Sequence, residues 1–121
     1  MQRKIKTTNI NLDPSIEEYL DKRLGAIEKL IDCSNPTLLV EIELAKTTNH
    51  HQSGDIFRAE LNLTIDGEHF RAEAERIDLN SAIDMMRDEI LNELRSYKGK
   101  RQSLIKRSGA KVKAFLRRFY K

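Results

Sequence analysis

Two long stretches of the chain carry apolar residues at the spacing of an amphipathic helix. The first begins at Asp13-Pro14, where Asp13 can cap a helix and Pro14 suits its first position, and it is broken by Ser34-Asn35-Pro36. The second begins after Asp78, another capping residue, and Gly99 marks either its end or a weak point within it. The expected buried stripes are Ile16, Leu20, Leu24, Ile27 and Ile31 in the first helix and Leu79, Ala82, Ile83, Met86, Ile90, Leu94 and Tyr97 in the second.

Between these helices, apolar and polar residues alternate with the period of a half-buried strand. The alternation covers residues 38–45, 57–65 and 70–75. Asp66-Gly67 predicts a hairpin turn between the last two, because both residues tolerate a positive φ. Residues 2–7 predict one further strand. Since it reaches the next strand through a helix, we expect these two strands to be parallel neighbours, followed by an antiparallel meander.

The order strand, helix, three strands, helix predicts an α+β domain. The sheet has one apolar face and both amphipathic helices need a surface to cover, so we expect both on that face. The predicted fold is a two-layer β-α-β-β-β-α sandwich with a four-stranded sheet. On the solvated face, Arg58 and Arg71 are expected to balance a row of acids through cross-strand pairs, namely Glu41, Glu43, Glu60, Glu73 and Glu75.

Charge is distributed unevenly along the chain. The 121 residues have a formal net charge of +3, but every acid lies between Asp13 and Glu93. Ten of the 22 Lys and Arg residues follow residue 97, which leaves residues 1–97 with a net charge of −7. We therefore divide the chain into a folded domain at residues 1–101 and a basic tail at residues 102–121. Basic segments of this kind bind nucleic acid or anionic lipid, or are simply solvated arms.

The basic tail also contains apolar and aromatic residues. About twelve residues of helical spacing form only a marginal helix in water, so we expect a tail that is disordered when free and ordered on a partner. The apolar stripe consists of Val112, Phe115, Leu116 and Phe119. The residues that can stack on bases are Tyr97, Phe115, Phe119 and Tyr120. For the two phenylalanines, a hydrophobic docking stripe is at least as good an explanation.

Catalytic and metal chemistry find little support in the residues. His50-His51 is the pair that invites a metal, but neither Cys33 nor His69 stands at a recognisable ligand spacing from it. The sequence has no glycine-rich phosphate loop, nucleophile elbow or redox motif. We expect no enzyme, cofactor, metal site or small-molecule substrate. A single cysteine, a polar N-terminus and no apolar run near ~18 residues indicate a cytoplasmic protein with no membrane partner.

Several stretches together give the chain a family likeness. The most specific stretch runs from His50 to Glu60. It is followed by Arg71 to Glu75, Asp78-Leu79, Ala82-Ile83-Asp84 and Tyr97-Lys98-Gly99-Lys100-Arg101. In these residues the chain resembles the ribosome hibernation-promoting factors, also called ribosome-associated inhibitor A or sigma-54 modulation proteins. The likeness runs over roughly residues 1–101. It implies the same β-α-β-β-β-α fold in a factor that binds the small ribosomal subunit in the mRNA–tRNA channel, near the decoding centre, and keeps idle ribosomes inactive.

The resemblance also implies where ribosomal RNA is contacted. The basic positions of the family pattern are matched by Lys22, Arg23 and Lys29 on the first helix and by Arg87, Arg95, Lys98, Lys100 and Arg101 on the second. Cations of the tail are also candidate rRNA contacts, because phosphate binding explains a run of cations without an acid. They are Lys106, Arg107, Lys111, Lys113, Arg117 and Arg118. We expect the partners to be the small subunit, its rRNA and the whole ribosome, and the protein to be a monomer away from them.

Two other functions stay open. A sheet with helices on one face also suits a general reader of double-stranded RNA. The apolar residues of the tail also suit docking on a membrane or a partner protein. Many family members carry a second domain that pairs two ribosomes, and the chain is expected to be too short for one. The tail is therefore left with several roles: running along the mRNA channel, contacting a ribosomal protein or blocking ribosome pairing.

Overall fold

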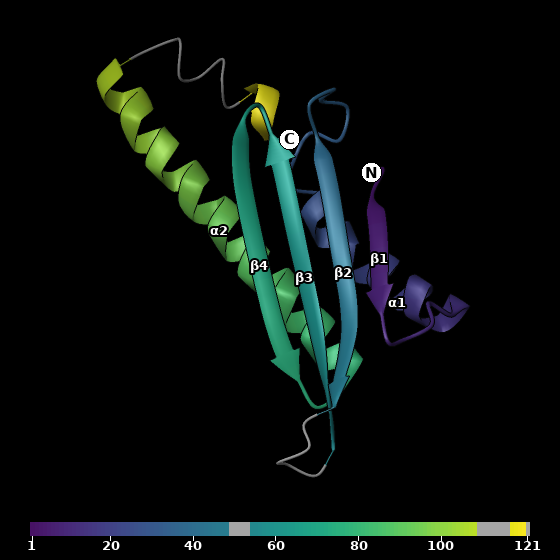
Figure 1. Cartoon of the computed structure of the whole chain (residues 1–121). Coiled ribbons are helices and arrows are strands. Elements are labelled where there is room, and N and C mark those ends of the chain that lie inside the picture. Colours follow the sequence, from purple (N-terminus) through teal and green to yellow (C-terminus); the bar gives the residue numbers. More distant parts are fainter. Residues whose placement is uncertain (49–53, 109–116, 121) are drawn as a thin grey trace.

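A computed structural model describes residues 1–48, 54–108 and 117–120, with Thr48 and residues 102–108 described by their backbone alone (Figure 1). Its elements are β1 (Lys4–Thr8), α1 (Pro14–Glu28), β2 (Leu39–Thr48), β3 (Asp55–Ile65), β4 (Glu68–Arg76) and α2 (Leu79–Ser108). The α+β fold and the element order predicted from hydrophobic periodicity are therefore confirmed.

The strands form one four-stranded sheet in the order β1-β2-β3-β4. β1 runs parallel to β2, with Ile5 opposite Ile42, and β2, β3 and β4 form an antiparallel meander. Both parts of this topology agree with the prediction. The chain turns between β3 and β4 at Asp66 and Gly67, whose φ angles of 48° and 80° are those that the predicted turn requires.

Both helices cover the same face of the sheet, and Figure 1 shows them together behind the strands. The side chains that point to this face alternate along each strand. In β3, Ala59, Leu61 and Leu63 are fully buried, whereas Arg58 and Glu60 between them point to the other face and are partly exposed. Burial of each large apolar side chain contributes roughly 1.5–3 kcal/mol. From the helices the same core receives Leu20, Leu24, Ile27, Ala82, Ile83, Met86, Ile90, Leu91 and Leu94.

Both predicted capping residues begin their helices. Asp13 Oδ1 accepts a hydrogen bond from the Ile16 N–H at 2.9 Å, and Asp78 Oδ1 accepts one from the Ser81 N–H at 2.8 Å. Hydrogen bonds from the Ser15 hydroxyl and the Ile16 N–H lower the pKa of Asp13, and those from the Ser81 N–H and hydroxyl lower the pKa of Asp78. Each carboxylate is thus kept ionised at the positive end of a helix dipole.

α2 passes Gly99 without interruption and continues to Ser108, so the first of the two alternatives for Gly99, the end of the helix, is wrong. A glycine commonly ends a helix by adopting the left-handed conformation. In the described chain the glycines with positive φ are Gly54 and Gly67, and Gly99 is not among them. Inside a helix a glycine costs only about 1 kcal/mol relative to alanine, which does not stop a long packed helix. The boundary at residue 101 therefore falls within α2.

The chain returns to the domain after α2. Phe119 is fully buried and Tyr120 is 4% exposed, and both belong to the hydrophobic core. We predicted a separate tail from residue 102 that is disordered when free. The described part of this tail differs from that prediction, because residues 102–108 continue α2, and Phe119 and Tyr120 pack in the core. Phe119 is accordingly not placed to stack on a base. Residues 109–116, with the rest of the apolar stripe, lie outside the described residues, so the docking stripe stays a prediction.

Candidate nucleic-acid interface

Arg23 of α1 is built into a contact between the two helices. The Tyr19 hydroxyl donates a hydrogen bond to Asp84 Oδ1 at 2.7 Å and accepts one from Arg23 Nη2 at 3.1 Å. Arg23 Nε lies 2.9 Å from the same Asp84 oxygen, and the guanidinium lies 4.6 Å from the centroid of the Tyr19 ring. The hydrogen bond to Tyr19 and the charge of Asp84 raise the pKa of Arg23. Arg23 therefore presents a fixed charge whose main task is to join α1 to α2.

Within the described part of the chain, Lys22 and Arg87 form ion pairs with local partners. Lys22 Nζ lies 3.4 Å from Glu18 Oε1, and Arg87 Nη2 lies 2.8 Å from Oδ1 of the neighbouring Asp88. The Lys22 and Glu18 side chains are 71% and 70% exposed. Exposed pairs one helical turn apart contribute only about 0.3–0.5 kcal/mol. Lys22 therefore loses little when an RNA phosphate replaces its carboxylate partner.

Lys29, Arg95 and Lys100 are the helix candidates with the greatest freedom. All three are exposed, and within the part of the chain that the structure describes none forms an ion pair. Lys29 is the C-terminal cap of α1, where a positive charge also complements the helix dipole. These side chains can reach a phosphate without breaking a contact in the protein.

Two further candidates near residue 100 lie over aromatic rings. Arg101 donates hydrogen bonds to the Tyr97 hydroxyl from Nε at 3.0 Å and from Nη2 at 2.8 Å, and Nη2 lies 3.7 Å from Glu68. The Lys98 ammonium lies 5.4 Å from the centroid of the Tyr120 ring. Burial raises the pKa of Tyr97, so its hydroxyl stays neutral beside Arg101.

Arg117 and Arg118 are the tail cations whose side chains the structure describes. Arg117 is exposed, and Arg118 Nη2 lies 3.1 Å from Asp66 Oδ1 in the turn between β3 and β4. Figure 1 shows their short segment, in yellow, beside that turn. For Lys106 and Arg107 only the backbone of α2 is described, and Lys111 and Lys113 lie outside the described residues. The structure thus gathers Lys98, Arg101 and Arg118 at one end of the domain.

The sequence did not single out the polar network that holds this end together. The Asp66 side chain is only 7% exposed. It accepts hydrogen bonds from Asn35 Nδ2 at 3.2 Å and from Thr37 Oγ1 at 3.3 Å, besides the bond from Arg118. In the sequence, Asn35 marks only a helix break and Asp66 only a turn, and no local signal reports that their side chains meet.

The face of the sheet away from the helices is rich in charge but neutralises itself. Glu43, Glu60 and Glu73 stand directly opposite one another across β2, β3 and β4. Arg58 forms ion pairs with all three, and Arg71 with Glu60 and Glu73. The cross-strand pairs predicted for the two arginines are therefore confirmed with Glu43, Glu60 and Glu73, and those with Glu41 and Glu75 stay a prediction.

These pairs decide what the outer face can do. Hydrogen bonds from Arg71 and Asn62 lower the pKa of Glu60 to about 2, and the bond from Arg58 lowers the pKa of Glu73. A general acid that works near neutral pH needs a raised carboxyl pKa. The bond to Glu73 raises the pKa of Arg58, and the bond to Glu60 raises that of Arg71. Glu60 and Glu73 therefore do not have the pKa that such an acid needs, and Arg58 and Arg71 are already held in ion pairs. The helical layer carries several exposed cations without an ion pair in the described chain, which makes it the better candidate RNA surface.

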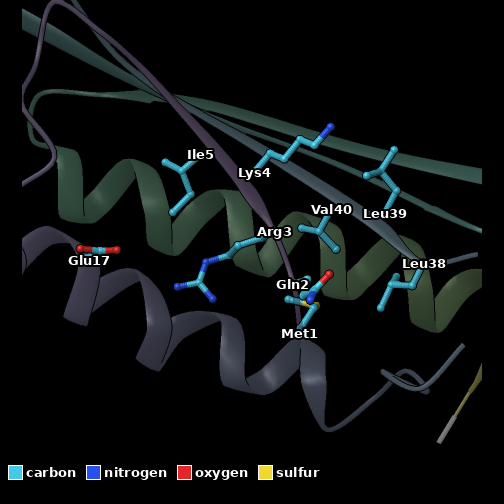
Figure 2. A pocket seen from close by; sticks show the side chains of 9 residues that line it. All are labelled: Met1, Gln2, Arg3, Lys4, Ile5, Glu17, Leu38, Leu39 and Val40. Carbon is cyan, nitrogen blue, oxygen red and sulfur yellow. The ribbon is translucent and has the colours of Figure 1, made fainter. Parts of the chain in front are cut away.

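A pocket of about 470 Å³ opens at the edge of the sheet, between β1, the start of β2 and α1 (Figure 2). Its walls combine apolar side chains such as Ile5 and Val40 with Arg3 and Glu17. Arg3 forms an ion pair with Asp21 of α1. Sites for small ligands bring several polar groups to one point in an apolar cavity. The arginine of this lining is already held in an ion pair, and we do not assign the pocket a ligand.

The described residues contain neither a metal-binding cluster nor a membrane-spanning helix. In the described ranges, no group of three or more His, Cys, Asp or Glu residues is placed to hold a metal ion. The pair His50-His51 lies outside those ranges. Among the helices that the structure describes, none is long and apolar enough to cross a membrane.

Comparison with known proteins gives a family match for most of the chain. A family model described as "Sigma 54 modulation protein / S30EA ribosomal protein" matches residues 4–102. The ribosome hibernation promoting factor of Klebsiella oxytoca is 26% identical over 100 residues, which cover 83% of this chain and 96% of that protein. The protein of the same name from Pseudomonas putida is 25% identical over 112 residues, which cover 92% of this chain and 100% of that protein.

Two solved structures share the fold. The N-terminal domain of Protein Y from Thermus thermophilus has a TM-score of 0.61 and 21% identity, and the match covers 80% of this chain and 99% of that domain. A ribosomal subunit interface protein from Coxiella burnetii has a TM-score of 0.60 and 21% identity, with 78% and 97% covered. At this level of identity the two structures support the fold alone.

Proposed function

Because the chain belongs to the Sigma 54 modulation protein / S30EA ribosomal protein family, we propose that it is a ribosome hibernation factor that binds the small ribosomal subunit. The proposed site is the channel that mRNA and tRNA occupy, near the decoding centre. The observation that carries the proposal is the family match over residues 4–102, which spans all the strands, α1 and most of α2. The two curated relatives bear the name of this function.

The proposed mechanism is occupancy of the channel, without turnover. Cations of the helical layer neutralise phosphates of the rRNA, which is the main source of affinity for a nucleic-acid backbone. The bulk of the domain then excludes mRNA and tRNA, so that idle ribosomes stay inactive. The protein acts in the cytoplasm, as a monomer away from the ribosome, and it is not an enzyme and needs no cofactor.

The fold ranks the candidate rRNA contacts. A contact that costs the protein no ion pair is favoured over one that does. The first rank consists of the candidates that are exposed and form no ion pair within the described chain, namely Lys29, Arg95, Lys100 and Arg117. The second rank consists of Lys22, in an exposed ion pair, and Lys98, over the Tyr120 ring. The third rank consists of four arginines that ion pairs hold in place: Arg23, Arg87, Arg101 and Arg118. Four further tail cations stay in the proposal because they belong to the run of cations without an acid: Lys106, Arg107, Lys111 and Lys113.

Sedimentation with purified ribosomes tests the proposal. The full chain is expected to travel with small subunits and whole ribosomes through a sucrose gradient, less so as salt rises. mRNA together with tRNA is expected to displace it, whereas a mixed-sequence RNA duplex at equal phosphate concentration is not. No sedimentation even at low salt would refute the proposal. Equal displacement by the duplex would replace it with general binding of double-stranded RNA.

A further inference from the structure

Residues 117–120, which we call the latch, are tied to the segment that follows α1. Ile31 and Tyr120 form an antiparallel bridge, and the Asp32 N–H donates a hydrogen bond to the Phe119 carbonyl oxygen at 3.2 Å. Asn35 Nδ2 donates another to the carbonyl oxygen of Arg118 at 3.0 Å. Main-chain atoms of the latch are therefore held at successive residues.

The latch also completes an aromatic cluster. The centroid of the Phe119 ring lies 5.6 Å from that of Phe70, 5.4 Å from that of Tyr97 and 4.6 Å from that of Tyr120. Edge-on and tilted arrangements at these separations are favourable for aromatic pairs. The Tyr120 hydroxyl donates a 2.6 Å hydrogen bond to the Leu94 carbonyl oxygen, and burial raises its pKa, so it stays protonated as a donor. The latch thus packs on α2 and β4 as well.

Of the described cations near this cluster, we call four the rim: Lys98, Arg101, Arg117 and Arg118. Lys98 rests over the Tyr120 ring of the latch, and the Arg101 guanidinium lies 5.0 Å from the centroid of the Tyr97 ring. Arg117 and Arg118 belong to the latch itself, where Arg118 is fixed by Asp66. The rings pack on one another, so the rim offers charge, and not a stacking surface for bases.

We propose that docking of the latch assembles the rim into a binding surface for RNA phosphates, an inference that rests on the proposed function and deepens it. A free arm with the same cations loses conformational freedom when it binds RNA, whereas a docked latch has lost that freedom beforehand. Positioned cations therefore bind more tightly than the same number on a free arm. The latch lies beyond the residues that the family model matches, so this surface is an addition to the matched domain.

The test is to undock the latch without changing any charge. In the double variant Phe119→Ala/Tyr120→Ala, all four rim cations remain. We expect affinity for purified small subunits to fall about tenfold at each salt concentration, with little change in salt dependence. Amide hydrogen exchange at Asp32 reports latch docking, because that N–H is bonded to Phe119, and its exchange is expected to accelerate.

A matched variant, Arg117→Ala/Arg118→Ala, removes charge instead. Its log-log salt slope is expected to fall by up to roughly 0.9 per lost phosphate contact. If the aromatic variant unfolds, Tyr120→Phe removes only the hydroxyl bond to Leu94, and a smaller loss of affinity with faster Asp32 exchange is then expected.

Unchanged affinity in a variant whose Asp32 amide exchanges faster would overturn the proposal, and so would an Asp32 amide that is unprotected in the parent chain. Failure of the proposed function is distinguishable from these results. If the parent chain does not bind ribosomes but binds an RNA duplex in a latch-dependent way, the proposal for the latch stands and the hibernation function is refuted. If the parent chain binds neither ribosomes nor the duplex, both proposals are refuted.

Discussion

The hydroxyl of Tyr19 in α1 donates a 2.7 Å hydrogen bond to Asp84 in α2, and the same carboxylate oxygen lies 2.9 Å from Arg23. One aspartate thus binds two side chains of the facing helix. Since Arg23 is held by this carboxylate and by the Tyr19 ring, the contact fixes both the spacing of the helices and the position of a candidate RNA-binding charge.

Replacement of Tyr19 by phenylalanine tests this contact. Tyr19→Phe keeps the ring under Arg23 and removes only the hydroxyl, so we expect the free energy of unfolding to fall by about 1 kcal/mol. Urea denaturation measures the change. Lys22→Ala, on the same helix with only a surface pair, is the control and is expected to change stability by less than about 0.5 kcal/mol. Equal effects of the two variants would contradict a specific role for the Tyr19 hydroxyl.

Acid sensitivity follows from the outer face of the sheet. The pKa of Glu60 is about 2 in the fold against 4.5 for a free side chain, so its ion pairs stabilise the fold fully above pH 4.5. That stabilisation is lost as the pH falls from 4.5 towards 2. We expect the loss due to Glu60 to be roughly 1–2 kcal/mol, because water reaches the network and weakens its ion pairs.

Unfolding measured by urea at several pH values checks this expectation. Glu60→Gln is expected to be less stable than the parent at pH 7, and this difference is expected to vanish near pH 2. Glu75→Gln, on the exposed end of the same face, removes one carboxylate in the same way and is the matched control for the loss of a charge. A constant difference between Glu60→Gln and the parent across the whole range would show that proton binding at Glu60 is not the cause.

Two glycines with open space around them are expected to respond in opposite directions to alanine. A Cβ on either Gly67 or Gly99 meets no atom within 4 Å, but Gly67 has a φ of 80°. Gly67→Ala is therefore expected to destabilise the fold by about 1–2 kcal/mol, and Gly99→Ala to stabilise it by about 1 kcal/mol. Thermal unfolding distinguishes the two. A loss of stability in Gly99→Ala would mean that α2 is not continuous through this residue.

The ranking of cations predicts a difference between the two faces of the domain. Arg95→Ala/Lys100→Ala removes two exposed charges of α2, and Lys4→Ala/Lys6→Ala removes two from β1. We expect only the α2 pair to weaken sedimentation with small subunits, with a salt slope shallower by up to roughly 1.8. Both variants have the same net charge. Equal weakening would therefore show that overall charge, and not the helical layer, determines binding.

Local patterns were sufficient to predict the fold. Alternation in β2 and β3, the caps Asp13 and Asp78 and the Asp66-Gly67 turn each depend on residues close together in the chain. The end of α2 was not predictable in this way. A glycine inside a helix and a glycine that ends one have the same sequence signal, and only the backbone conformation separates them.

The candidate site was predictable only as a set of charges. Counting cations indicates a basic end of the chain, but the partner of each cation depends on tertiary structure. Arg118 meets Asp66, and Phe119 is buried against Phe70, through contacts between segments far apart in the sequence. A short cationic segment with aromatic residues has the same composition whether it is a free arm or a packed part of the core.

The burial of Phe119 also bears on when during synthesis the aromatic cluster forms. Chains fold from the N-terminus as they are synthesised, and Phe119 and Tyr120 follow every other core residue in that order. The sheet can form and α1 can dock while the last core residues are still inside the ribosome. The aromatic cluster, however, closes only after residue 119 has emerged. In the proposed function, the rim is therefore not assembled until its residues have left the ribosome that made them.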